Sequence, residues 1–186
     1  MKTLVVYKSK SGFTRKYAEW IGEKLGAEIR EASKVTVETL SAYDTLIYGG
    51  GLYAVGINGV KLITKNLKRL TDKKIVVFTT GASAPAEKVT NDVLSANFTP
   101  AQLKQIRFFY LQGGFDYNKL TPFYKAVMSL MKWSLKRKKN LTADERGMLA
   151  AFDQPVDFTD LNNIKELIFL CNFKRLTCSL ANGMDY

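Results

Sequence analysis

The feature that most constrains the fold is a set of short apolar runs, each followed by a polar, glycine-containing loop and a helical pattern. The first run, residues 3–7 (Thr-Leu-Val-Val-Tyr), has the composition of a strand buried on both faces, as in parallel sheets. After its loop, Tyr17, Ala18 and Ile21 recur at helical spacing. We expect Gly26 to end that helix in a left-handed conformation.

The same unit recurs along the chain. We expect further strands at residues 27–30, 45–48, 74–80 and 106–111, and helices at about 60–69 and 86–95. A last helix begins after Thr159 or Asp160 as N-cap. This alternation predicts an α/β fold with a doubly wound, five-stranded parallel sheet in one domain, residues 1–186. Ligands of such sheets bind at the carboxyl ends of the strands.

Residues 112–159 interrupt this alternation, because connections in such folds are usually about 2–6 residues long. We expect a basic helical insertion at about 116–158, after the fifth strand. Its helix is predicted to be amphipathic, with lysines at 125, 132 and 136 opposite a single apolar face. That apolar face comprises Leu120, Phe123, Tyr124, Val127, Met128, Met131 and Leu135.

Charge and composition narrow the function classes. The net charge is +11, and seven basic residues lie between 119 and 139 with no acidic residue among them. The chain has no histidine, which excludes histidine-dependent catalysis and the common histidine metal sites. We expect the two cysteines, Cys171 and Cys178, to be apolar core or interface residues, because their spacing fits neither a redox pair nor a zinc site.

The sequence also leads to expectations about the location and the partners of the protein. The apolar run at the N-terminus is too short for a signal peptide, and no stretch reaches the ~20 apolar residues of a bilayer span. We therefore expect a cytoplasmic protein that can lie at the inner face of the membrane. The basic segment carries no nucleic-acid-binding motif, so no nucleic-acid partner is expected.

The first loop carries the sharpest chemical signal. Ser9, Ser11 and Thr14 offer three hydroxyls within one turn, and Gly12 allows an anion to approach the backbone closely. The loop opens onto a helix N-terminus, whose free N–H groups and positive dipole favour a phosphate. The alternative is a polar turn in which Thr14 only caps the helix.

The loops after the third, fourth and fifth strands complete the predicted site. Tyr53 lies in a glycine-rich turn and can cover one face of a planar ring, although an ordinary half-buried aromatic is an equal alternative. A planar heterocycle fits between this turn and the small residues of the fourth loop. The candidate residues in these loops are Gly51, Leu52, Tyr53, Ala54, Thr80, Gly81, Ala82, Gly113, Gly114 and Phe115.

These residues carry a family resemblance. The segment Ser9-Lys10-Ser11-Gly12-Phe13-Thr14 resembles the flavodoxin phosphate loop, (S/T)-x-(S/T)-G-x-T. Residues 43–49 and 75–81 look like the third and fourth strands of that family with their loops. The resemblance covers residues 1–118 and resumes in the last helix. It implies a flavodoxin-like fold and FMN as cofactor, with the phosphate on residues 9–14 and the flavin ring near Tyr53, Gly81 and Gly114.

The insertion is similar to one branch of that family. The segment 111–117 (Leu-Gln-Gly-Gly-Phe-Asp-Tyr), followed by a helix rich in methionine and lysine, resembles the flavodoxin-like protoporphyrinogen oxidases. That resemblance implies a membrane-associated oxidoreductase that passes electrons to a quinone. The positive charge departs from the acidic electron-carrying flavodoxins and counts against a generic carrier role. A redox protein with a small-molecule acceptor, a non-redox interaction module and a homodimer remain open.

Overall fold

The computed structural model describes residues 2–120 and 122–172. Five parallel strands form its sheet, in the order β2-β1-β3-β5-β6. The predicted five-stranded α/β fold is therefore confirmed. The strands are β1 (Thr3–Lys8), β2 (Glu28–Glu31), β3 (Thr45–Tyr53), β5 (Lys74–Gly81) and β6 (Ile106–Gln112).

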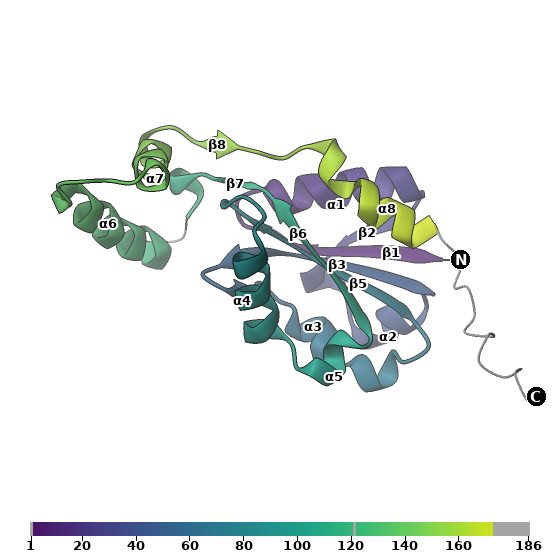
Figure 1. Cartoon of the computed structure of the whole chain (residues 1–186). Coiled ribbons are helices and arrows are strands. Elements are labelled where there is room, and N and C mark those ends of the chain that lie inside the picture. Colours follow the sequence, from purple (N-terminus) through teal and green to yellow (C-terminus); the bar gives the residue numbers. More distant parts are fainter. Residues whose placement is uncertain (1, 121, 173–186) are drawn as a thin grey trace, which may run out of the picture.

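Helices cover both faces of the sheet (Figure 1). One face packs on α1 (Phe13–Leu25) and α8 (Lys165–Asn172), with Val5, Ile47 and Val76 buried between the layers. Alternate strand residues point to the other face. There Leu4, Val6 and Val77 belong to a second core. The helices on that side are α2 (Val37–Ser41), α3 (Lys61–Thr64), α4 (Glu87–Asn97) and α5 (Pro100–Leu103).

Short elements link these helices and strands. One-turn 3₁₀ segments follow β2 and α3 and precede α6 and α8. Gly26 ends α1 in the left-handed conformation (φ 58°), as predicted, and Asp160 N-caps the segment that leads into α8. The residues predicted to continue the last helix, including Cys178, lie outside the described part. The 3₁₀ segments are η1 (Ala32–Lys34), η2 (Leu67–Arg69), η3 (Tyr117–Lys119) and η4 (Leu161–Ile164).

The third strand is longer than predicted. Gly49, Gly50 and Gly51 continue β3 instead of forming a loop, and the chain then turns into β4 (Gly56–Ile57), antiparallel to β3. A side chain at Gly49 would collide with the Phe78 ring, with its Cβ only 2.2 Å from that ring. The predicted helix over 60–69 was also wrong, because this stretch forms only α3 and the 3₁₀ segment η2.

The insertion lies beyond the end of the sheet at which β6 finishes (Figure 1). It consists of two helices between two short strands that pair antiparallel with each other. The elements are β7 (Gly114–Phe115), α6 (Pro122–Arg137), α7 (Ala143–Asp153) and β8 (Val156–Asp157).

Only part of the predicted apolar face of α6 contacts the rest of the protein. The helix has no buried residue, and its apolar side chains divide into two groups. Tyr124, Met128, Met131 and Leu135 are half-buried. Phe123, Val127, Leu130 and Trp133 are exposed to solvent. Sequence periodicity orders side chains around a helix, but it does not say which arc meets the rest of the protein.

Candidate functional site

The first loop leaves the N-terminus of α1 open. Gly12 is the N-cap with φ 99°, a left-handed value that disfavours any other residue. The Gly12 N–H donates to Ser9 Oγ at 3.1 Å, which closes the turn. Among the described residues no side chain caps the helix, and its first turn carries no acidic residue. Its first N–H groups and positive dipole end are therefore available to an anion.

Thr14 is a buried residue in the first turn of α1. Its side chain is 2% exposed, and its Oγ1 lies 2.6 Å from Oγ1 of Thr80, which is 6% exposed. The alternative that Thr14 caps the helix was wrong, because Gly12 holds that position. The hydroxyl pair instead joins the first turn of α1 to the end of β5. The two strand-end loops thus meet at a buried polar contact.

A cavity of about 270 Å³ opens between the loops after β3 and β5. Four of the predicted residues lie on its wall: Leu52, Ala54, Gly81 and Ala82. The predicted juxtaposition of these two loops is therefore present in the structure. The other lining residues are Val55, Ser83, Val89, Asp92, Val93 and Tyr110.

Tyr110 and Asp92 are cavity residues that sequence reasoning missed. The Tyr110 hydroxyl donates to the Ser83 carbonyl at 3.1 Å, and it fills the space that a side chain at Gly81 would need. Burial raises the pKa of Tyr110 above its usual value, so the phenol is neutral at pH 7. The sequence offers little indication of a site role for Tyr110, because this residue stands out only as part of the apolar run 106–111.

The turn after β3 is held in a strained conformation. Ala54 has φ 52°, an unfavourable value for a residue with a side chain. The Asn97 side chain of α4 fixes the turn. Its Oδ1 accepts from the Ile57 N–H at 2.8 Å, and its Nδ2 donates to the Val55 carbonyl at 2.6 Å. Local strain maintained by surrounding contacts is common at binding sites.

Tyr53 is not among the residues that line the cavity, and it packs in an aromatic cluster. Its ring lies 4.7 Å from that of Tyr124 in α6, centroid to centroid, at an interplanar angle of 36°. The ammonium of Lys10 lies 4.8 Å from the Tyr53 centroid and 5.4 Å from the Tyr124 centroid. Burial, and then the neighbouring Tyr124, raise the pKa of Tyr53. Tyr124 was predicted only as part of an apolar helix face.

The loop after β6 serves mainly as the entrance to the insertion. The Gly113 N–H donates to the Gly81 carbonyl at 2.7 Å, so Gly113 stays close to the fourth loop. Gly114 makes room for the Phe13 ring, whose nearest atom would lie 2.6 Å from an added Cβ. The Phe115 ring packs edge-on against Phe152 of α7. Neither Gly113, Gly114 nor Phe115 lines the cavity.

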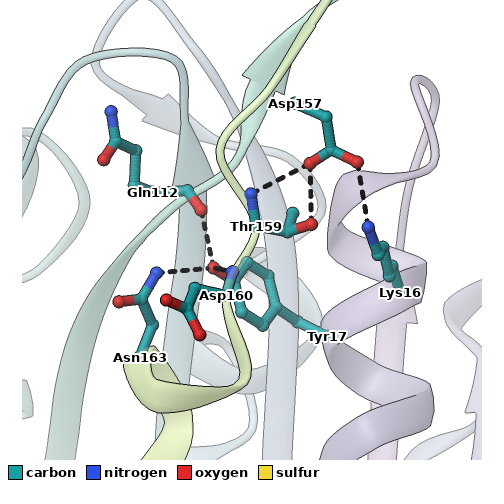
Figure 2. A network of polar contacts seen from close by, with 7 residues as sticks. All are labelled: Lys16, Tyr17, Gln112, Asp157, Thr159, Asp160 and Asn163. Atoms are coloured by element: carbon teal, nitrogen blue, oxygen red, sulfur yellow. Dashed lines mark hydrogen bonds and ion pairs between the residues drawn. The ribbon is translucent and has the colours of Figure 1, made fainter.

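A polar network fixes the other side of α1 to the segment that returns from the insertion (Figure 2). The Tyr17 hydroxyl donates to the Gln112 carbonyl at 2.7 Å and accepts from Asn163 Nδ2 at 2.8 Å. The Asp157 carboxylate accepts from Lys16 Nζ at 2.9 Å and from Thr159. Burial pushes the pKa of Asp157 upward, but the hydrogen bonds outweigh it and hold that pKa below its usual value.

These features define a class of protein: a parallel α/β fold with an open helix N-terminus at the first loop and a cavity between the third and fourth loops. The family model described as "Flavodoxin domain" matches residues 4–142. The chain belongs to the flavodoxin domain family. No curated protein matches the chain.

Solved structures of low sequence identity are also similar to the chain. Oxidised flavodoxin 1 from Bacillus cereus is 20% identical, with coverage of 76% of this chain and 100% of that chain and a TM-score of 0.43. The Trp repressor binding protein of Bacillus subtilis is 15% identical, covers 69% of this chain and 96% of its own, and has a TM-score of 0.45. A WrbA-like flavodoxin from Agrobacterium tumefaciens is 19% identical, with 59% and 82% coverage and a TM-score of 0.40.

Proposed function

We propose that this protein binds FMN and works as a flavin-dependent oxidoreductase or electron-transfer protein. The observation that carries the proposal is the open N-terminus of α1 behind the Ser9–Gly12 turn, with no side-chain cap and no acidic residue in its first turn. Such an end suits a phosphate dianion. Membership of the flavodoxin domain family supports FMN over other phosphate ligands.

The residues present fit this cofactor. Ser9, Ser11 and the N–H groups that begin α1 would hold the phosphate, and the Thr14–Thr80 pair connects them to the edge of the cavity. The loops after β3 and β5 would hold the flavin ring, with Ala54 and Gly81 on the wall. FMN supplies the redox chemistry when bound, so the lack of histidine in the chain is no obstacle. The protein binds, orients and shields the ring.

The phosphate part of the site can be tested with one matched pair of variants. Gly12→Ala and Gly26→Ala both place a side chain at a positive φ, at opposite ends of α1, and both have open space around the added methyl. Both should lose stability, but only Gly12→Ala should weaken FMN binding, by at least about tenfold. Fluorescence titration with FMN and with riboflavin, which lacks the phosphate, measures this. Equal FMN affinity in the two variants would disprove the phosphate site.

The cofactor assignment has its own test. The purified protein, or the protein reconstituted with FMN, should be yellow and show the absorbance bands of oxidised flavin. A non-redox interaction module with a flavodoxin-like fold would bind no flavin. Ser11→Ala serves as a mild variant, since no hydrogen bond of its side chain occurs within the described residues. It should lower affinity for FMN while leaving affinity for riboflavin unchanged.

We also propose that α6 lies on an anionic membrane surface, where a quinone accepts the electrons. Phe123, Leu130 and Trp133 are 71%, 66% and 52% exposed, an unusual arrangement for a helix in water. Basic residues 136–139 follow at its end. Two copies facing each other through this surface would bring like charges together, which disfavours a homodimer there. No described helix is long and apolar enough to span a bilayer, so the contact would be peripheral.

Vesicle sedimentation tests the membrane contact. Binding should be measurable with anionic vesicles and negligible with neutral ones, and it should fall with added salt. Phe123→Ser with Leu130→Ser should abolish it, whereas Phe169→Ser, which removes an exposed phenylalanine of α8, should not. Binding unaffected by the double substitution would disprove the role of α6. The specific activity that we propose at the membrane is quinone-linked and protoporphyrinogen oxidase-like. It is assayed with a panel of porphyrinogens and quinones.

A further inference from the structure

The first turn of α6 touches the predicted flavin site through one aromatic side chain. Tyr124 lies next to the ring of Tyr53, and Phe123 packs edge-on against Tyr124 at 5.5 Å. Further along the helix the exposed residues Val127 and Leu130 point to solvent. The insertion therefore reaches the strand-end loops near its N-terminal turn, although α6 buries no residue of its own.

Lys10 extends this contact to the first loop. Its ammonium lies within 5.4 Å of both tyrosine ring centroids, a distance at which a cation is attracted to an aromatic face. Lys10 belongs to the predicted phosphate loop, and Tyr53 is the last residue of β3. One side chain of α6 thus lies close to two residues that come from different parts of the candidate site.

We propose that Tyr124 is a positioning residue of the flavin site, and that it acts through Tyr53 and Lys10. The proposal rests on the proposed function. The Tyr53 side chain has less conformational freedom, because Tyr124 packs against its ring. A preordered Tyr53 gives up less entropy when a planar ligand settles against it. The α6 turn is in this way linked to the cofactor, so binding of flavin orders the beginning of the insertion.

The test compares three variants of the full chain. Tyr124→Ala should weaken both FMN and riboflavin by about tenfold and should partly restore the fluorescence of bound flavin. Tyr124→Phe keeps the ring and should behave like the unmutated protein. Ser134→Ala changes an exposed residue further along the same helix and serves as the control. If Tyr124→Ala binds and quenches flavin as the unmutated protein does, the proposal is wrong while the proposed function stands.

A double variant tests whether Tyr124 acts through Tyr53. If it does, Tyr53→Ala with Tyr124→Ala should bind riboflavin no more weakly than Tyr53→Ala alone, because both changes remove the same contribution. Fully additive losses would contradict positioning. Hydrogen exchange in the unmutated protein avoids any problem of variant folding: amides of residues 123–128 should exchange more slowly when FMN is bound. Equal exchange with and without FMN would overturn the proposal, and absence of flavin binding would overturn the proposed function with it.

Discussion

The sheet with its covering helices and the insertion are stabilised in different ways. In the sheet, residues such as Ile47, Val76 and Phe78 are fully buried between two layers of helices. In the insertion, α6 buries nothing and α7 buries Ala151 and Phe152. The sheet owes its stability to apolar burial, whereas the insertion depends on a few local contacts.

Those local contacts are aromatic and ionic. Phe152 packs against the rings of Phe115 and Tyr117 at centroid distances of 5.6 and 5.5 Å. Lys132 pairs with Asp153, and Lys138 with Glu145, each at 2.7 Å. These two of the seven basic residues between 119 and 139 are therefore paired within the insertion. The basic segment therefore uses part of its charge in internal ion pairs, while the exposed apolar side chains of α6 remain available to a partner.

The largest difference in stability is expected between a substitution of a buried residue in β5 and one of an exposed residue in α6. Phe78→Ala should lower the free energy of unfolding by about 3–5 kcal/mol, because it removes a buried ring and leaves a cavity beside Gly49. Leu130→Ala should change it by less than about 0.5 kcal/mol. Denaturant unfolding of both variants measures the difference. Similar losses would mean that α6 is as essential to folding as the sheet.

Substitutions at the junction between the sheet and the insertion should change the free energy of unfolding by an intermediate amount. A methyl group at Gly114 would lie 2.2 Å from the Val156 carbonyl oxygen and 2.6 Å from the Phe13 ring, so Gly114→Ala should cost about 1–3 kcal/mol. Gly147→Ala, inside α7, meets no atom within 4 Å and should stabilise its helix by about 0.5–1 kcal/mol. Thermal unfolding should therefore shift in opposite directions. A neutral Gly114→Ala would show that the junction can move apart.

The smallest expected effect concerns the ion pair that fastens the returning chain to α1. The pKa of Asp157 is below its ordinary value of 3.8, so its carboxylate stabilises the fold above that pH and the contribution disappears as pH falls through the lowered pKa. Because the pair is half exposed, Asp157→Asn should cost only about 0.5–1 kcal/mol at neutral pH. The difference in Tm between the two proteins should vanish once the pH is below the lowered pKa. A difference that persists in acid would exclude the charge as its cause.

Much of the sheet could be predicted from local sequence, because β-branched apolar runs and cap residues act over a few positions. Residues 3–7 and 74–80 and the cap Gly26 are examples. The continuation of β3 through Gly49–Gly51 could not be predicted this way. Glycine there is required by the Phe78 ring, which comes from another strand, and a single sequence does not reveal that contact.

The position of the candidate site could be predicted where it follows the strand ends. The Ser9–Gly12 turn and the two loops that border the cavity come together because the loops that follow parallel strands lie at one edge of the sheet. The contact between Tyr53 and Tyr124 joins residues 71 positions apart across two regions. Helical periodicity grouped Tyr124 with Phe123, yet one faces the protein and the other faces water. Only the tertiary packing separates them.

The pairing of β7 with β8, where the insertion begins and ends, has a consequence for how this chain can vary in length. The outgoing and returning strands are already joined by the pairing of Gly114 with Asp157 and by the bond from the Phe158 N–H to the Gly113 carbonyl at 2.7 Å. The buried Tyr17 hydroxyl links Gln112 on the outgoing side to Asn163 on the returning side. The two ends of the insertion are therefore held side by side. Segments of other lengths can be spliced in there while the register of the parallel strands stays unchanged.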